Sequence, residues 1–308
     1  MQYVMVSTAV VDEIHFPNSE SVIQAPGGAG LYAYAGARLW HHEIALVCGK
    51  GKDFSQTLGP IFAEHGIGDE YMFPVDLETP RTIVRYQDDG ERTETPVYGK
   101  SHYERFVAGF EQLSAHLDHV RGVYLFKAAD DKIFWDSLLA KKKASAFTLM
   151  WEISASSTKP EYLETVVNLA KQVDILSINR TEATNLFGGT EQEVIEQLKA
   201  LHIPLVFYRR GKQGAMLITP DQEVSVPSDF SYELVDPTGA GNSSSAAVLV
   251  GFCEKKDLYE IGMMGSIASG SNIEQYGIVA LSEKSVYERA RQRLAYWLKR
   301  KEKQDEVG

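Results

Sequence analysis

The most informative stretch of the chain reads Leu234-Val-Asp-Pro-Thr-Gly-Ala-Gly-Asn-Ser-Ser-Ser-Ala-Ala-Val-Leu-Val-Gly-Phe252. A turn with proline, threonine and two glycines runs directly into a helix of small and apolar residues. Glycine lets the backbone approach a ligand closely, and the first turn of a helix leaves amide N–H groups without partners. Because these donors and the helix dipole point the same way, such a turn binds phosphate well. Taken alone, this stretch is better explained as an ordinary glycine-rich loop before a buried helix.

Apolar, β-rich runs alternate with helical patterns along most of the chain. The predicted strands cover residues 3–10, 43–48, 122–126, 147–153, 174–178 and 205–208. The predicted helices lie near 29–40, 53–65, 131–142, 159–171 and 190–201. This repetition predicts an α/β fold with three α/β/α layers, in which helices cover both faces of a mostly parallel central sheet. Ligands then belong at the carboxyl ends of the strands.

Residues 11–25 and 80–98 break this alternation. They resemble short, half-exposed strands joined by turns such as Asp89-Gly90. We predict a small β-sheet that stands off the main body as a lid, and a pair of surface hairpins is an equal alternative. The absence of repeats or a clear linker favours one domain over residues 1–308. An open edge of the lid could be protected by pairing in a homodimer.

The composition limits the classes of partner. The chain has 308 residues, and its 42 acidic residues against 31 Lys and Arg give a net charge of −11. This balance argues against general nucleic-acid binding, which needs clustered cations. Two cysteines so far apart, Cys48 and Cys253, favour a reducing compartment. The N-terminus has no basic leader and the longest apolar run, 246–253, is far short of the ~20 residues that cross a bilayer. We therefore expect a soluble, cytoplasmic protein without a membrane partner.

Three further motifs could carry chemistry. A glycine-rich segment, 25–39, opens a helix but lacks the last glycine of a dinucleotide fingerprint, and no P-loop motif occurs. Asn179 and Glu182 follow a strand and share one helical face, although a helix capping box is a strong structural alternative. The run Arg210-Gly211-Lys-Gln-Gly214 fits a tight turn between strands or a basic loop that faces phosphate.

Taken in order, the four motifs resemble those of the ribokinase-like sugar kinases, also called the PfkB family, over nearly the whole chain. Gly27-Gly28 matches the substrate-side Gly-Gly motif of that family. Asn179-x-x-Glu182 matches its Asn-x-x-Glu motif for magnesium and phosphate. Asp12 falls where the family places an Asp that binds a substrate hydroxyl. The resemblance implies a ribokinase-like fold with a small lid.

The nucleotide side of the family pattern is also present. Gly211-x-x-Gly214 matches its Gly-x-x-Gly turn, and the stretch from Asp236 to Asn242 matches its Asp-x-x-Gly-Ala-Gly-Asp signature except at the last position. The family's catalytic base is therefore replaced by Asn242. Tyr32 likewise stands where the family has a substrate-binding Asn. With these two changes the chain resembles a poorly characterised branch of the family, in which Asn is the usual residue at the position of Asn242.

Loss of the base changes the expected chemistry. A carboxamide can orient the attacking hydroxyl, but it cannot accept the proton at neutral pH. General base catalysis is worth roughly 10²–10⁴-fold, whereas positioning and charge stabilisation supply most of the catalysis in loose phosphoryl transfer. Either another carboxylate accepts the proton, with Asp236 and Asp12 nearest by motif, or the protein binds its ligands with little turnover.

The resemblance implies an ATP-dependent, Mg²⁺-requiring carbohydrate kinase, with a monovalent cation as an optional cofactor. The acceptor would be a hydroxyl of a sugar or sugar-like small molecule. The alternatives are a nucleotide- or sugar-binding pseudokinase and, third, a scaffold that binds partners. The expected substrate-binding residues are Asp12, Gly27, Gly28, Tyr32, Trp151 and Glu152, although core burial is a comparable fate for Trp151.

The remaining roles follow the matched motifs. Around the transferring phosphoryl group we expect Gly239, Ala240, Gly241, Asn242 and Asp236, with Asn242 orienting the acceptor. On the nucleotide side we expect Asn179, Arg210, Gly211, Gly214 and Thr238. Glu182 and Asn179 would organise Mg²⁺ through water.

Overall fold

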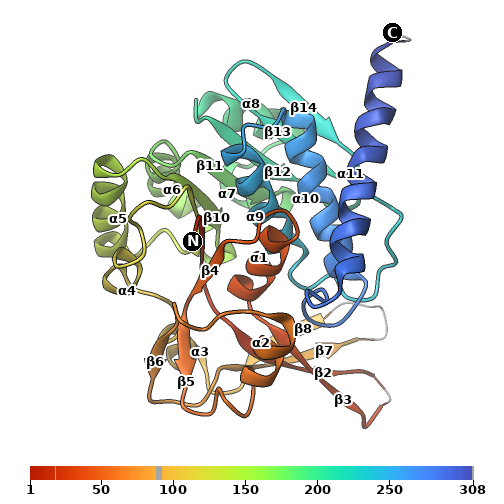
Figure 1. Ribbon diagram of the computed structural model, residues 1–308. Helices are drawn as coiled ribbons and strands as arrows, with labels where there is room; N and C mark the ends of the chain where they lie inside the picture. Colours follow the sequence, from red (N-terminus) through yellow and green to blue (C-terminus); the bar gives the residue numbers. More distant parts are fainter. Residues whose placement is uncertain (18, 88–91, 307–308) are drawn as a thin grey trace.

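The computed structural model describes residues 1–17, 19–87 and 92–306, so the predicted Asp89-Gly90 turn lies outside the described residues. Its centre is an eight-stranded sheet with the order β14-β13-β12-β11-β10-β9-β1-β4 (Figure 1). The strands from β4 to β12 are parallel, and β13 and β14 continue the sheet antiparallel. The strands are β1 (Tyr3–Val6), β4 (Ile44–Val47), β9 (Gly122–Lys127), β10 (Thr148–Ile153), β11 (Ile175–Asn179), β12 (Leu205–Arg209), β13 (Ala215–Ile218) and β14 (Glu223–Val226).

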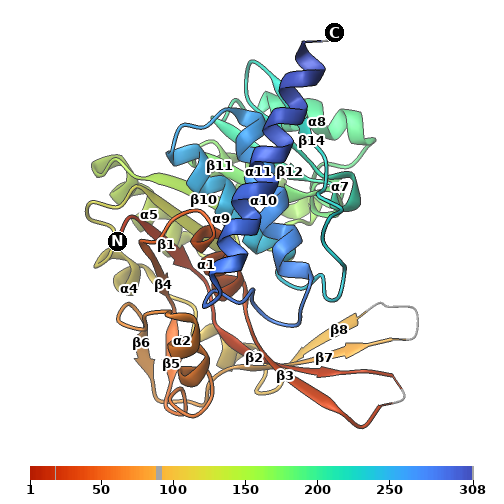
Figure 2. The ribbon, with the colours of Figure 1, turned by 45° about the vertical axis from the view of Figure 1, so that its right-hand side comes forward.

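Helices cover both faces of this sheet, which confirms the predicted three layers. One apolar core joins the sheet to α1 (Ala29–Arg38), α9 (Ala240–Cys253) and α10 (Leu258–Ile273). A second core joins the opposite face to α5 (Lys132–Ala144), α6 (Leu163–Ala170), α7 (Arg180–Phe187) and α8 (Glu191–Ala200). The long α11 (Lys284–Asp305) lies along α10 (Figures 1 and 2). Because both faces are covered, neighbouring strand residues such as Leu149 and Met150 are both buried, and the strands read as continuous apolar runs.

A separate four-stranded sheet, in the order β3-β2-β7-β8, stands off the main body (Figure 2). Its strands are β2 (Val10–His15), β3 (Val22–Gly27), β7 (Arg81–Tyr86) and β8 (Arg92–Pro96). The predicted small sheet is therefore present. The predicted strand 3–10 is wrong in one respect, because β1 ends at Val6 and the chain enters the small sheet at Val10. Both halves are buried, and the break is marked only by two hydroxyl residues, Ser7 and Thr8, which are buried as well.

Other boundaries also differ from the pattern. The helix expected at 53–65 begins only at Gly59, and the one expected at 159–171 starts as a 3₁₀ turn. The α10 helix was not predicted, because it lies between α9 and α11 and is apolar on most sides. The remaining elements are β5 (Gly49–Gly51), β6 (Phe73–Val75), α2 (Gly59–His65), α3 (Lys100–Glu104), α4 (Phe110–Ser114) and 3₁₀ turns at Ala155–Ser157, Pro160–Tyr162 and Gly211–Gln213. Within the described chain, no helix has the length and apolarity needed to span a bilayer.

Candidate active site

A cavity of about 400 Å³ opens where β11 and β12 end and α9 begins. Asn179 and Arg209 contribute to it from the carboxyl ends of the two strands, where they are paired neighbours. Ala240 and Gly241 line it from the first turn of α9. Its outer wall includes Phe230, which is 76% exposed. The volume falls in the range of small-molecule sites, and the place is the one expected for a ligand of a parallel α/β sheet.

The start of α9 depends on two glycines. Gly239 caps the helix with φ of 75°, in the left-handed region, and no side chain among the described residues caps the first-turn amides. A Cβ on Gly239 would collide with the ring of Tyr32, and one on Gly241 would collide with the guanidinium of Arg209. The glycines therefore let two large side chains pack directly against this helix terminus. Its Ala240 amide donates to the Pro237 carbonyl over 3.3 Å, a weak bond that an anion could replace.

Asn242 belongs to a buried hydrogen-bond network. Its Nδ2 donates to the Tyr124 hydroxyl over 3.1 Å and to Oε1 of Glu152 over 3.3 Å. Tyr124 in turn donates to Oε2 of Glu152 over 2.8 Å. An ionised carboxylate only accepts hydrogen bonds, so the amide nitrogen of Asn242 must point toward this pair. Its oxygen is then left to accept a hydrogen bond from a hydroxyl group.

Arg209 connects this network to the cavity. Its Nη2 lies 3.1 Å from Oε1 of Glu152 and 3.5 Å from Oε2 of Glu182. Glu152 is only 3% exposed, and the Arg209 side chain is 14% exposed. Buried charges require partners, and one guanidinium here serves two carboxylates. The two acids come from β10 and from the first turn of α7, so Arg209 joins two of the predicted site segments.

Asn179 and Glu182 form a capping box at the start of α7. The Glu182 amide donates to Oδ1 of Asn179 over 2.9 Å, and the Asn179 amide donates to Oε2 of Glu182 over 2.8 Å. The structural alternative for this motif is thus realised, while Asn179 also lines the cavity. Burial raises the pKa of Glu182 above its ordinary value, although the positive charge of Arg209 opposes the rise.

The expected acceptor side lies at the base of the small sheet. Asp12 is on β2, not at the end of the first strand of the main sheet, and it is 5% exposed. Its carboxylate packs so closely on Gly27 that any Cβ there would collide with it. Tyr32 is buried beside it and hydrogen-bonds to its carboxyl group. Burial, assisted by the negative charges of Glu94 and Asp236, raises the pKa of Asp12 to about 8.

Asp236 ties the small sheet to the loop before α9. Its Oδ1 accepts hydrogen bonds from the Thr238 amide over 2.8 Å and from the Thr238 hydroxyl over 2.6 Å. It also accepts one from the Tyr86 hydroxyl over 2.8 Å, and Arg92 approaches it to 3.9 Å. Tyr86 stacks on Phe16, whose ring also contacts Tyr276 beyond α10. The small sheet is therefore anchored on the glycine-rich loop that precedes α9.

Several expected site residues lie apart from the cavity wall. Trp151 is fully buried on the opposite face of β10 from Glu152, where it packs edge-on against Trp135. Alternation along a strand explains this, because neighbouring side chains point to opposite faces. The Arg210 guanidinium contacts Ser225 and does not line the cavity, whereas Gly211 and Gly214 do. Thr238 binds Asp236 through both its amide and its hydroxyl.

Two functional candidates were missed from the sequence. Arg209 ends β12 and shares a face with Phe207, which belongs to the core beneath α9. Tyr124 likewise faces α9 from β9. The alternation of β12 could have indicated Arg209. Side chains two positions apart on a strand share a face, so Arg209 lies on the face of the core residue Phe207, at the end of the strand. Nothing in the pattern distinguished Tyr124 from an ordinary core residue.

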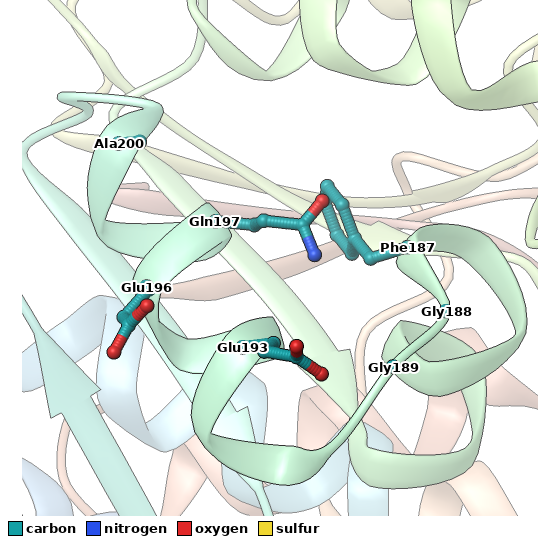
Figure 3. Close-up of a pocket in the computed structure, with 7 residues that line it drawn as sticks. All are labelled: Phe187, Gly188, Gly189, Glu193, Glu196, Gln197 and Ala200. Atoms are coloured by element: carbon teal, nitrogen blue, oxygen red, sulfur yellow. The ribbon is translucent and has the colours of Figure 1, made fainter.

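A second hollow lies between α7 and α8 (Figure 3) and shares no lining residue with the cavity beside α9. Its wall includes Gly189, Glu193 and Glu196. Glu193 accepts hydrogen bonds from the Thr190 amide and hydroxyl over 2.7 and 2.9 Å, so its carboxylate caps α8. Helix capping accounts for the Glu193 carboxylate, and the cavity beside α9 is the candidate active site.

The model of the pfkB family of carbohydrate kinases matches residues 5–284 of the chain. An uncharacterised protein of Schizosaccharomyces pombe is 22% identical over 320 residues, covering 92% of this chain and 88% of its own. A nucleoside kinase of Methanocaldococcus jannaschii is 23% identical over 278 residues, covering 85% of each chain.

The fold is also shared with solved structures. A fructokinase of Vibrio cholerae, crystallised with fructose, ADP and calcium ion, superimposes with a TM-score of 0.73 at 19% sequence identity. The match covers 94% of this chain and 98% of the fructokinase chain. Similarity at this level of identity concerns the fold.

Proposed function

The chain belongs to the pfkB family of carbohydrate kinases, and on this premise we propose that it transfers the terminal phosphoryl group of ATP to a hydroxyl of a sugar or nucleoside-like acceptor. ATP use is typical of the family. The observation that carries the proposal is the junction of the 400 Å³ cavity with the Asn242 network at the start of α9. The donor phosphates and the acceptor hydroxyl would meet at this junction.

The residues on each side support a division of roles. The amides of Gly239, Ala240 and Gly241 would hold the transferring phosphoryl group, with the Ala240 amide giving up its 3.3 Å hydrogen bond to the Pro237 carbonyl, and Gly211 and Gly214 would border the nucleotide. Asn242 would orient the acceptor hydroxyl through its side-chain oxygen. Because transfer is loose, positioning and charge stabilisation can supply most of the rate without a carboxylate at this position.

The carboxylate in contact with Asn242 is Glu152, but its Oε1 is held by Asn242 and Arg209 and its Oε2 by Tyr124, so it positions Asn242 and is no freer to act as a base than Asp236. Asp236 is engaged by Thr238 and Tyr86. Asp12 would bind an acceptor hydroxyl beside Gly27 and Gly28, the neutral carboxyl acting as a donor as well as an acceptor. Tyr32 fills the space between Asp12 and Gly239, so acceptors must fit against its ring or displace it.

Mg²⁺ fits the donor side of this site. Mg²⁺ keeps several waters and is usually held by one or two carboxylates together with substrate phosphates. Glu182 and Asn179, at the end of β11, would hold it through water, and the ion would neutralise charge on the transferring phosphates. Within the described residues no cluster of three His, Cys, Asp or Glu side chains forms a dedicated metal cage, in keeping with a shared, phosphate-dependent ion. A monovalent cation is proposed on the resemblance alone.

The assay is ADP formation from ATP and Mg²⁺ with a panel of sugars and nucleosides. We expect ADP release that depends on one class of acceptor, and Glu182→Gln to require a higher Mg²⁺ concentration for half-maximal rate. An unchanged Mg²⁺ dependence would refute the role of Glu182. The absence of turnover with every acceptor would refute the enzyme and leave the pseudokinase if ATP still binds, or the scaffold if it does not.

We further propose that residues 1–308 act as one domain with the small sheet as its lid. The lid anchor through Tyr86 and Asp236 supports this. On β3, the outer strand of the lid sheet, Val22 and Ile23 are exposed and offer an edge for a homodimer. Two free cysteines, one of them buried, are consistent with a cytoplasmic location.

A further inference from the structure

We propose that Arg209 is the cationic catalytic residue that contacts the transferring phosphoryl group. This inference rests on the proposed phosphoryl transfer and assigns it a residue outside the matched motifs. Arg209 is the last residue of β12 and lines the cavity together with Ala240 and Gly241. A planar guanidinium with several donors is suited to bind phosphate oxygens in a forked geometry.

The first argument is the position of the positive charge. One Nη atom of Arg209 lies so close to Gly241 that a Cβ there would collide with it. The N-terminus of a helix carries a partial positive charge, so a cation at this end is unfavourable unless anions compensate it. Glu152 and Glu182 supply this compensation at 3.1 and 3.5 Å. A phosphoryl group entering the cavity would bring a further anion to the same point.

The second argument is the incomplete hydrogen bonding of Arg209. Both Nε and Nη2 are buried, and neither has a hydrogen bond of good geometry to any group in the described part of the chain. The contacts of Nη2 with the two carboxylates are short enough for ion pairs, but they do not have the geometry of hydrogen bonds. Buried donors are normally satisfied, and unsatisfied ones are common where a ligand binds. A phosphoryl group has oxygen atoms to accept these donors.

The third argument is the link to the acceptor side. Arg209 contacts Oε1 of Glu152, and the same oxygen accepts a hydrogen bond from Asn242. One carboxylate thus fixes both the cation beside the donor cavity and the amide that would orient the acceptor hydroxyl. Glu152 is a positioning residue in this arrangement.

The test compares Arg209→Met and Arg209→Lys with a control, Arg121→Met. Arg121 also pairs with a glutamate, Glu254, but it directly precedes β9 and so lies at the edge of the sheet opposite to the carboxyl ends that border the cavity. At saturating ATP and acceptor we expect kcat of Arg209→Met to fall by about 10²–10³-fold, with a smaller loss for Arg209→Lys. The Kd for ADP should change less than threefold, and the control should keep the wild-type kcat. A kcat of Arg209→Met within threefold of wild type would overturn the inference.

If the proposed function itself is wrong, the wild-type protein forms no ADP with any acceptor, and this outcome separates that failure from a failure of the Arg209 inference. In that case the inference is decided by binding of ADP and Mg²⁺ with and without aluminium fluoride, which mimics the transferring phosphoryl group. We expect fluoride to tighten ADP binding in wild type and Arg121→Met, and not in Arg209→Met. Equal tightening in all three, or none in wild type, would overturn it. If Arg209→Met does not fold, the double variant Arg209→Met/Glu152→Gln takes its place and is compared with Glu152→Gln alone, so that the loss is assigned to Arg209.

Discussion

Replacing Asn242 by Asp, which restores the carboxylate of the family signature, should destabilise this protein. The Nδ2 atom of Asn242 lies 3.3 Å from Oε1 of Glu152, which is 3% exposed. An oxygen of the new carboxylate would take that place and turn a hydrogen bond into a contact between two acids. At 3.3 Å and an effective dielectric constant of 20, two unit charges repel by about 5 kcal/mol. Arg209 already compensates Glu152, so we expect a loss of about 2–4 kcal/mol at pH 8.

The sign of the pH dependence follows from the same contact. Repulsion raises the pKa of the new carboxyl group in the folded protein above its value in the unfolded chain. The folded state then binds the extra proton more tightly, so the stability of Asn242→Asp relative to wild type is best at low pH and falls as pH rises.

The measurement is the free energy of unfolding in urea at pH 5 and pH 8, in a double-mutant cycle with Glu152→Gln. In the Glu152→Gln background, Asn242→Asp should cost less than about 1 kcal/mol, because the opposing charge is gone. An equal cost in both backgrounds, with no dependence on pH, would refute the proposed contact.

Three further predictions concern the loop, the acceptor side and the lid. Gly239→Ala should lose at least about 2 kcal/mol of stability in thermal unfolding and most ATP affinity in calorimetry, because a Cβ meets the ring of Tyr32 and φ is positive; wild-type values would contradict this. Because the folded pKa of Asp12 is raised to about 8, its contribution to stability is present below about pH 4 and is lost as pH rises through 8. Asp12→Asn should flatten the slope of unfolding free energy between pH 5 and 8.5, and an unchanged slope would contradict the assignment. Tyr86→Phe removes one hydrogen bond to Asp236, so we expect a loss of about 1 kcal/mol and faster proteolysis within residues 80–98, and an unchanged cleavage rate would argue against the anchor.

The sequence predicted those parts of the fold that depend on local pattern. Buried parallel strands such as β10 and β11 stand out as apolar runs, and the glycine-rich turn before α9 has few structural alternatives once the other motifs are counted. The break between Val6 and Val10 is marked only by the short polar pair Ser7 and Thr8, because the chain passes from one buried strand to another in a different sheet. Only tertiary contacts decide where such a run divides.

The candidate site was predicted where motifs carry it and missed where packing carries it. The Asn179 and Glu182 motif fitted two roles, and in the structure it caps α7 while Asn179 also borders the cavity. The pairing of Glu152 with Asn242 joins residues 90 positions apart in the chain, and no spacing rule could have indicated it. Arg209 could not be recognised from spacing either, because its two carboxylate partners, Glu152 and Glu182, lie on other elements.

Transfer of label from ATP tests the central claim most directly. The protein is incubated with Mg²⁺, ATP labelled in the terminal phosphate, and the acceptor that best supports ADP formation. The account predicts that the label appears in a phosphorylated acceptor in step with ADP, and that Arg209→Met slows its appearance by about 10²–10³-fold while Arg121→Met does not. Label that stays in ATP with every sugar and nucleoside, or that appears only in free phosphate, would contradict the account.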